Sequence, residues 1–322
     1  MPLNSARALV AHEFEQFKTL IRDNINSNIG LVDDLSHHIF KSGGKRIRPL
    51  ILLLTGKACG ILDNDHILSA AAIEYFHTAT LLHDDVLDES QLRRGQHTAN
   101  SLWGDKTSIL VGDILLTQSI QFMTQTNRMP MLSVLINAAH DITCGEVKQL
   151  ANAHASQLNV NDYFDVIRAK TAKLFSATTE IGAMASNMPQ PIIENMRAYG
   201  LHLGNAFQII DDLLDYKATS DILGKEPGDD LREGKITLPL IYTLESASRS
   251  EKELIQNSLK DDSKDNFSEI LQMMHKYHSF EKTLITAKQE GNKALVALDL
   301  LANSQAKKSL ANLVDFTLNR SH

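Results

Sequence analysis

The sequence is poor in residues that interrupt helices and has very little cysteine. With 7 prolines and 16 glycines in 322 residues, long stretches contain nothing that ends a helix. This distribution favours helices over strands. The 2 cysteines cannot form a disulfide framework, and they have no zinc-ligand spacing. We therefore expect core thiols in a reducing compartment.

Excess positive charge and long apolar runs are also missing. The net charge is −7, and no basic stripe with interleaved aromatic residues is present, so nucleic acid is not expected as a partner. No apolar run approaches the ~18 residues of a membrane span. The N-terminal residues include Glu13 and Glu15 and lack the apolar core of a secretion signal. The sequence predicts a cytoplasmic protein without a transmembrane segment.

Helical periodicity covers nearly the whole chain, and strand patterns are almost absent. No composition shift marks a linker, so the simplest interpretation is one all-α domain over residues 1–322. The periodicity predicts helices at about 5–27, 30–41, 48–60, 66–88, 96–102, 106–127, 130–151, 161–184, 190–217, 236–245, 251–258, 265–277, 279–301 and 304–319.

An acidic segment, "TLLHDDVLDESQLRRG" (80–95), ends the predicted helix 66–88. At about 100° per residue, Asp84 and Asp88 share one helix face, and Asp85 lies to the side. Like charges at this spacing repel, and Mg²⁺ removes the repulsion while leaving coordination positions for a phosphate. A single such cluster is also typical of a solvated helix end. The surrounding apolar helix favours the metal site.

A second acidic segment repeats the spacing. Asp211, Asp212 and Asp215 lie 127 residues after Asp84, Asp85 and Asp88, again behind an apolar helix. Two such clusters on buried helices are poorly explained as devices for solubility. We expect the two helices to face each other across a cavity, where six carboxylates hold a diphosphate through bound Mg²⁺.

Cationic residues accompany both clusters. Arginine suits phosphate because its guanidinium is a planar fork. An interior lysine such as Lys170 needs an anion. The candidates are Arg93 and Arg94 after the first cluster, Lys225 and Lys235 after the second, Lys170 beside Thr171, and Lys41, Lys45, Arg46 and Arg48 in the basic loop "KSGGKRIRPL".

Together these segments resemble the trans-prenyl diphosphate synthases. "GGKRIRP" is similar to that family's isopentenyl diphosphate motif, "HDDVLDESQLRRG" to its first Asp-rich motif, and "QIIDDLLDY" with "GDDLREGKITLP" to its second. The resemblance covers about residues 40–240 and is strongest to the bacterial octaprenyl diphosphate synthases, which make the ubiquinone side chain. It implies a helical bundle around a deep central cavity, an isoprenoid synthase-like fold, a homodimer, and Mg²⁺ as cofactor.

The resemblance also implies residue roles. The catalytic set comprises Asp84, Asp85, Asp88, Asp211, Asp212, Asp215, Lys170 and Lys225. Asp84, Asp88 and Asp211 resemble the metal ligands. Lys45, Arg48, His77 and Arg94 resemble the groups that bind isopentenyl diphosphate. Arg93, Lys170, Thr171, Gln208, Lys225 and Lys235 resemble contacts to the allylic diphosphate, with farnesyl diphosphate as the expected primer.

The resemblance further implies that product length depends on the positions four and five before the first aspartate. Thr80 and Ala79 stand there, and both are small, which suits a long prenyl tail. With such a product the resemblance also implies peripheral contact with a membrane surface, which the sequence itself does not show. Alternatives are another product length, such as geranylgeranyl, heptaprenyl or solanesyl, and a non-catalytic subunit of a heteromeric synthase. A terpene cyclase is a further rival, although it has little use for "GGKRIRP" or for a second acidic motif.

Overall fold

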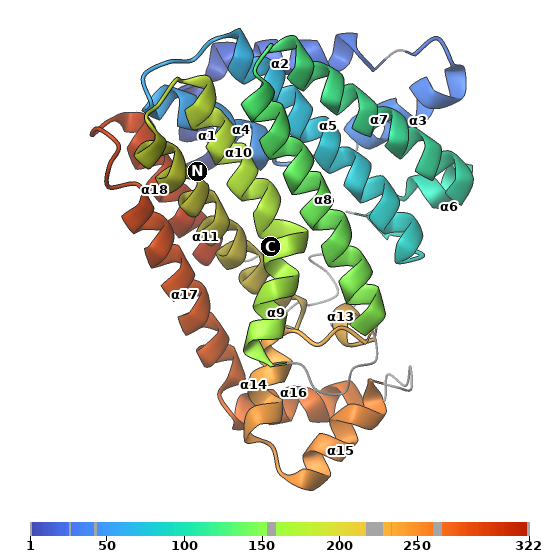
Figure 1. Cartoon of the computed structure of the whole chain (residues 1–322). Coiled ribbons are helices and arrows are strands. Elements are labelled where there is room, and N and C mark those ends of the chain that lie inside the picture. The colour runs from blue at the N-terminus through green and yellow to red at the C-terminus, as the bar shows by residue number, and fades with distance from the viewer. Residues whose placement is uncertain are drawn as a thin grey trace. The chain divides into compact units, whose positions relative to one another are not determined.

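The first half of the chain folds into helices with one small hairpin. The computed structural model describes residues 2–25, 27–41, 44–93, 95–152, 159–216, 228–232, 234–259 and 266–320. The elements of the first half, in chain order, are α1 (Pro2–Ala8), α2 (Ala11–Asp23), α3 (Gly30–Lys41), α4 (Ile47–Ala58), α5 (Asn64–Leu87), the antiparallel pair β1 (Leu92–Arg93) and β2 (Gln96–His97), α6 (Ala99–Trp103), α7 (Asp105–Gln125) and α8 (Met129–Asn152) (Figure 1).

The regular elements among the described residues of the second half are all helices. Its elements are α9 (Val160–Ile167), the π-helical turn η1 (Arg168–Ala172), α10 (Lys173–Ala185), α11 (Gln190–Asp215), α13 (Asp229–Arg232), α14 (Leu238–Ser246), α15 (Arg249–Ser258), α16 (Phe267–Lys276), α17 (Ser279–Ala297) and α18 (Gln305–Leu318). The predicted all-α fold is confirmed. Among the helices that the structure describes, none combines the length and apolarity needed to cross a bilayer.

The chain divides into two compact units, each with its own core. The single-domain organisation expected from the sequence stays a prediction. The first unit comprises Met1–Asn137, Ala177–Arg197 and Leu298–Leu313, and the second comprises Ala138–Ser176, Ala198–Ala297 and Val314–His322.

The core of the first unit is built around α5. This helix begins at Asp63, which forms a capping box with His66. It is buried over most of its length and packs against α4 and α7. In α4 the five aliphatic side chains 50–54 are fully buried. At roughly 1.5–3 kcal/mol for each buried side chain, they hold α4 firmly in the core.

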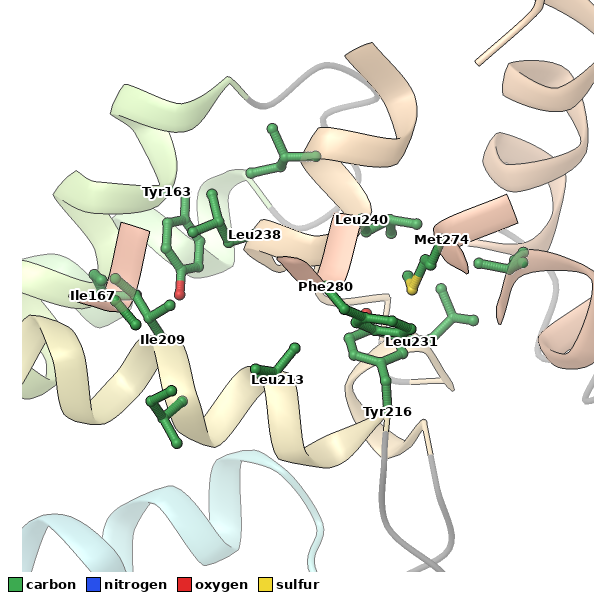
Figure 2. Packing of buried hydrophobic residues seen from close by; sticks show 14 of the residues in the cluster. Tyr163, Ile167, Ile209, Leu213, Tyr216, Leu231, Leu238, Leu240, Met274 and Phe280 are labelled. Atoms are coloured by element: carbon green, nitrogen blue, oxygen red, sulfur yellow. The ribbon is translucent and has the colours of Figure 1, made fainter. Parts of the chain in front are cut away.

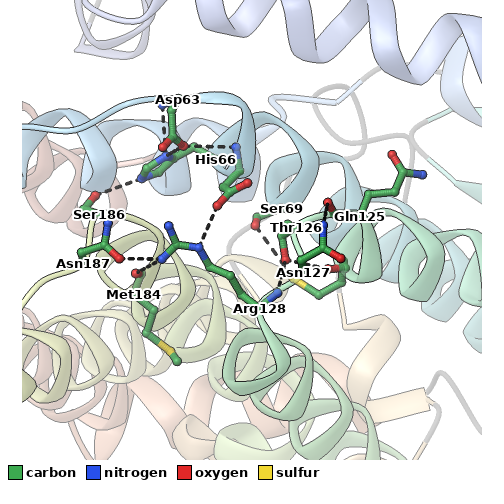
Figure 3. A network of polar contacts seen from close by, with 12 residues as sticks. Asp63, His66, Ser69, Gln125, Thr126, Asn127, Arg128, Met184, Ser186 and Asn187 are labelled. Atoms are coloured by element: carbon green, nitrogen blue, oxygen red, sulfur yellow. Dashed lines mark hydrogen bonds and ion pairs between the residues drawn. The ribbon is translucent and has the colours of Figure 1, made fainter.

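A polar network joins the start of α5 to the end of α10 (Figure 3). The His66 ring lies between the Asp63 carboxylate, 2.8 Å from Nδ1, and the Ser186 hydroxyl, 2.9 Å from Nε2. Aspartate, histidine and serine in this order look like a hydrolase triad. However, Ser186 is only 2% exposed, and its hydroxyl donates to the Gly182 backbone oxygen at 3.0 Å. The group therefore stabilises the fold.

The second unit has an apolar cluster to which α9, α11, α14, α16 and α17 contribute (Figure 2). Tyr163 and Ile209 lie at one side of it and Met274 and Phe280 at the other. Gly228 closes a turn beside this core with a φ of +82°, and a Cβ at this position would lie 2.2 Å from the ring of Phe267. A side chain at residue 228 is therefore excluded both by backbone strain and by the ring.

One carboxylate of the second unit is buried inside a polar network. Glu290 on α17 is 3% exposed and accepts hydrogen bonds from His202 (2.8 Å), Asn205 (2.7 Å) and Lys293 (2.6 Å). Burial by itself would raise the pKa of Glu290, but the hydrogen bonds from His202, Asn205 and Lys293 outweigh it and lower the pKa to about 2. The network therefore keeps this carboxylate ionised and fixes α17 to α11.

The predicted helices differ from the observed ones in four places. The predicted helix 5–27 is two helices, α1 and α2, separated by a turn at residues 9–10. The predicted helix 161–184 contains the π-helical turn η1. The predicted helix 96–102 starts later because β1 and β2 precede it, and the short α13 was not predicted. The first three differences are local irregularities within predicted helices, whereas α13 lies between two predicted helices.

Candidate active site

The first acidic segment lies at the C-terminal end of α5. Asp84 is half-buried in the last turn, and its backbone oxygen accepts the N–H of Asp88 at 2.8 Å, where the helix ends. Asp88 is exposed, whereas Asp85 is only 2% exposed. The β1 strand brings Arg93 to Asp85, with 2.7 Å between Nε and Oδ1. Arg93 therefore neutralises the buried carboxylate of the segment.

The second acidic segment lies at the C-terminal end of α11. Asp212 is 6% exposed and accepts hydrogen bonds from the Tyr163 hydroxyl (2.5 Å) and from Gln208 (2.7 Å). Burial raises the pKa of Asp212 well above its usual range, and the nearby charge of Asp230 raises it further. The Asp211 side chain is 56% exposed. Asp212 is thus an internal anchor, and Asp211 is accessible.

Both segments divide their three aspartates in the same way. The second aspartate of each, Asp85 or Asp212, is buried and hydrogen-bonded by neighbouring side chains. Asp84, Asp88 and Asp211 are more exposed. The division follows from helical geometry, because adjacent residues point about 100° apart.

These exposed carboxylates fit a hard cation. In the described part of the chain, no three His, Cys, Asp or Glu side chains form a closed metal site. Mg²⁺ does not need such a cage, because it binds through one or two carboxylates and keeps positions for water and phosphate oxygens. The half-buried Asp84 and the exposed Asp88, one helical turn apart, suit this coordination.

The basic loop before α4 directs its side chains to different partners. Arg48 Nη1 lies 3.0 Å from Nε2 of His77, so two residues predicted to bind the same diphosphate are in contact. Lys45 is exposed. Arg46 has a left-handed backbone with a φ of 44°, pairs with the buried Glu74 and donates to the Phe40 backbone oxygen at 2.8 Å. Arg46 therefore holds the loop in place.

The π-helical turn η1 carries Lys170 and Thr171. Lys170 Nζ is 2.9 Å from Oε1 of Glu146 on α8, and its side chain is 28% exposed. Thr171 donates to Gln208 at 2.7 Å, and Gln208 in turn donates to Asp212. The extra residue of a π turn alters side-chain direction within a helix, and such turns are frequent at functional sites. Here the turn places Thr171 so that it is linked through Gln208 to Asp212 of the second acidic segment.

Close helix packing supports this turn. A Cβ at Gly145 of α8 would lie 2.5 Å from Cβ of Ala169, and a Cβ at Gly204 of α11 would lie 2.5 Å from Cα of Ala172. Both neighbouring helices thus approach η1 at a residue without a side chain. The position of Lys170 and Thr171 is therefore set by packing on two sides.

The chain matches the polyprenyl synthetase family over residues 30–277, which include both acidic segments, the basic loop and η1. The chain belongs to this family. It is 38% identical over 321 residues to the octaprenyl diphosphate synthase of Escherichia coli (strain K12), with 99% of each chain covered. The resemblance inferred from the motifs is confirmed.

Solved structures of polyprenyl synthetases have the same fold. The decaprenyl diphosphate synthase of Rhodobacter capsulatus has a TM-score of 0.94 at 37% identity and covers 99% of both chains. The polyprenyl synthase of Caulobacter crescentus CB15, complexed with calcium and isoprenyl diphosphate, has a TM-score of 0.95 at 36% identity and covers 99% of this chain and 98% of that one. As a polyprenyl synthetase, the chain is a prenyltransferase that makes long-chain all-trans prenyl diphosphates.

The predicted chain-length positions of this synthetase lie about one turn before Asp84. Ala79 is 1% exposed, and Thr80 is half-buried with its hydroxyl donating to the His77 backbone oxygen at 2.8 Å. Tyr75, one turn earlier, packs its ring against Phe40 and Phe122, at centroid distances of 5.0 and 5.2 Å. The bulky aromatic of this helix therefore belongs to the aromatic packing between α3, α5 and α7.

Arg320, near the C-terminus, was missed by the sequence analysis. Its side chain is 8% exposed, pairs with Oδ1 of Asp211 at 3.0 Å and donates to the Phe207 backbone oxygen at 2.6 Å. The guanidinium carbon lies 3.9 Å from the centre of the Phe207 ring. No motif surrounds this residue in the sequence, so only the fold brings it to the second acidic segment. Tyr163 and Glu146 were missed for the same reason.

Of the other predicted cationic residues, the structure describes Lys235 and does not describe two. Arg94 and Lys225 lie outside the described residues. Lys235 is half-buried, and its backbone N–H donates to Asp230 at 2.8 Å. The backbone of Asp230 in turn donates to Oδ2 of Asp215 at 3.3 Å, and Gly228 donates to the Asp215 backbone oxygen at 3.1 Å. The segment 228–235 is thus fastened to the end of α11.

Proposed function

We propose that this polyprenyl synthetase is an octaprenyl diphosphate synthase that supplies the side chain of a quinone. It would condense isopentenyl diphosphate repeatedly, by 1′-4 linkage, onto an allylic primer such as farnesyl diphosphate. The full-length similarity to an octaprenyl diphosphate synthase supports the product class. The observation that carries the mechanism is the shared division of the two acidic segments, each with one buried and anchored aspartate and with exposed aspartates beside it.

We assign the metal-binding role to Asp84, Asp88 and Asp211. When bound, Mg²⁺ would neutralise the diphosphate of the primer and make it a better leaving group. Asp85 and Asp212 act one step away, by holding Arg93 and by accepting from Tyr163 and Gln208. Asp215 receives the returning segment at residues 228–235.

The cationic residues divide between the two substrates. Arg48 and His77, which are in contact, would bind the isopentenyl diphosphate together with Lys45 and Arg94. Arg93, Lys170, Thr171, Gln208, Lys225 and Lys235 would contact the allylic diphosphate. The Lys170–Glu146 pair supports this role, because Glu146 keeps the ammonium group oriented and partly exposed until an anion arrives.

The reaction then follows from charge separation. The allylic C–O bond breaks, and the diphosphate leaves with the electron pair. The alkene of isopentenyl diphosphate attacks the allylic cation through its terminal carbon. Loss of a proton to the departed diphosphate completes the new trans double bond. Water must be excluded while the cation exists.

The product tail would pass Ala79 and Thr80. Their small side chains favour a long product, since a bulky residue would end the tail there. We propose that the long product is delivered at a membrane surface while the enzyme itself works in the cytoplasm. Of the two cysteines, Cys59 is buried, whereas Cys144 is exposed, so the expectation of a core thiol is wrong for Cys144.

We also propose a homodimer. On α6 and α7, three large apolar side chains are exposed: Leu102 (49%), Ile109 (41%) and Leu110 (63%). Apolar side chains gathered on one surface are typical of protein interfaces. Sedimentation of the purified chain would test the proposal, and a monomer at micromolar concentration would contradict it.

The function is tested by sizing the product. The purified chain is incubated with labelled isopentenyl diphosphate, farnesyl diphosphate and Mg²⁺, and the dephosphorylated product is separated by chromatography. The expected product is an octaprenol, and EDTA should abolish its formation. A cyclic hydrocarbon from farnesyl diphosphate alone, or activity only after a partner chain is added, would contradict the proposal.

A further inference from the structure

A cavity of about 470 Å³ lies in the first unit, among α1, α2, α3 and the loop before α4. Its lining contains none of the residues assigned above to metal or substrate binding. The volume falls within the roughly 300–1,000 Å³ of small-molecule sites. At about 30 Å³ for each water-sized group, it has room for roughly fifteen carbon-sized groups.

The floor of the cavity is apolar and aromatic. Phe14, Phe17 and Phe40 line it and are 4%, 1% and 8% exposed, respectively. Ile21 and Ile25 complete the floor. The rings of Phe14 and Phe17 lie 5.4 Å apart. Such a surface suits a branched, unsaturated hydrocarbon chain, which contacts ring faces well.

The wall of the cavity is cationic. Among the described residues that line it, the ionisable ones are all basic: Arg7, Lys18, Arg22, His37, Lys41 and Arg46. Three of these have a carboxylate partner: Lys18 with Glu15, Arg22 with Asp23, and Arg46 with Glu74.

Two of the basic residues retain uncompensated charge. Within the described residues, no ion pair connects Arg7 or Lys41 to a carboxylate. Arg7 donates one Nη2 hydrogen bond to the Lys45 backbone oxygen at 2.6 Å, and its buried Nε has no partner in the described part of the chain. A buried guanidinium N–H without an acceptor is unfavourable. The Arg7 guanidinium also lies 5.3 Å from the centre of the Phe14 ring. A phosphate in the cavity would supply the anionic partner for the accessible ends of Arg7 and Lys41.

We propose that this cavity binds a prenyl phosphate of about farnesyl length, with the chain on the phenylalanine floor and the phosphate at Arg7 and Lys41. Aromatic contacts, limited volume and unpaired cations together fit a short isoprenoid chain with a phosphorylated head. The choice of chain rests on the proposed function. Binding of the prenyl phosphate uses the side-chain cations Arg7 and Lys41, so it needs no Mg²⁺. It can therefore be measured in EDTA, where the Mg²⁺-dependent reaction does not run.

The test is calorimetric titration of the full-length chain with farnesyl monophosphate in EDTA. We expect one site per chain. The double variant Lys18→Glu with Arg22→Glu reverses two wall charges whose side chains are 53% and 71% exposed, so folding should be unaffected. The double variant should weaken binding of farnesyl monophosphate by at least about tenfold through charge repulsion.

The matched control is Arg249→Glu in the second unit. The Arg249 side chain is 94% exposed and is also paired with a nearby glutamate. This control should bind as the wild type does.

The controls separate the head from the chain. Inorganic pyrophosphate and farnesol should each bind at least about tenfold more weakly than farnesyl monophosphate, because each has only half of the recognised chemistry. Absence of binding in EDTA would overturn the proposal, as would equal binding to wild type and the double variant. Tighter binding of lysophosphatidic acid than of farnesyl monophosphate would overturn the prenyl assignment in favour of an acyl lipid. If the chain fails to bind farnesyl monophosphate in EDTA but still makes octaprenyl diphosphate, this proposal fails and the proposed function stands.

Discussion

Two chemically identical substitutions, Asp85→Asn and Asp88→Asn, should have opposite consequences. Asp85 is 2% exposed and pairs with Arg93 at 2.7 Å. Asp88 is exposed at the end of α5. If Asp85 holds Arg93, Asp85→Asn loses stability. If Asp88 holds Mg²⁺, Asp88→Asn loses activity.

The magnitude for Asp85→Asn follows from burial. Removing one partner of a fully buried ion pair costs about 3–5 kcal/mol. Because Arg93 is 34% exposed and the amide oxygen of asparagine still accepts a hydrogen bond, we expect about 1–2 kcal/mol. At an unfolding entropy of about 2.1 cal/mol/K per residue, 1 kcal/mol shifts the Tm of a 322-residue chain by about 1.5 °C, so the Tm should fall by about 1.5–3 °C.

The assay combines thermal unfolding with Mg²⁺-dependent turnover of isopentenyl and farnesyl diphosphates. Asp88→Asn should keep the wild-type Tm and lose at least about 100-fold in kcat/KM, as expected for a metal ligand. Asp85→Asn should lose about tenfold or less, because Arg93 is then less well oriented. A stable Asp85→Asn enzyme, or a fully active Asp88→Asn enzyme, would refute the division of roles.

Three further changes test other parts of the structure. Ala79→Tyr should shorten the product markedly, with Ala79→Ser as the control that keeps it, and unchanged length would show that the tail does not pass this position. Arg320→Ala should raise the Mg²⁺ concentration for half-maximal activity about tenfold, because Asp211 loses its anchor, whereas a lower requirement would show that Arg320 competes with the metal. The pKa of Glu290 is lowered in the folded protein, so protonation of this carboxylate in acid costs the folded state stability. The free energy of unfolding of the wild type should therefore fall between about pH 4.5 and pH 2, and that of Glu290→Gln should fall less over this interval.

The sequence was sufficient to predict the helices and the residues within local motifs. The spacing of Asp84, Asp85 and Asp88 determines which of them can share a helix face, and the observed burial follows it. Apolar periodicity likewise predicted a helix at about 48–60, where α4 lies. These features depend on residues fewer than about five positions apart, within the reach of helical geometry.

Features that depend on distant residues could not be predicted. The Arg320–Asp211 contact joins residues 109 positions apart, and the Tyr163–Asp212 contact joins residues 49 apart. The π-helical turn at Lys170 is equally hidden, because its glycine neighbours Gly145 and Gly204 lie on other helices. Both contacts and the π-helical turn depend on packing between helices that are distant in the sequence.

The central claim is that the two acidic segments act on a single metal-bound diphosphate. The affinity of a non-reactive allylic thiodiphosphate in Mg²⁺ can be measured for the wild type, for Asp84→Ala, for Asp211→Ala and for the double variant. If both carboxylates serve one ligand, the two losses should be non-additive by at least about 0.5–1 kcal/mol. Additive losses would contradict the account, because they would mean that Asp84 and Asp211 act independently of each other.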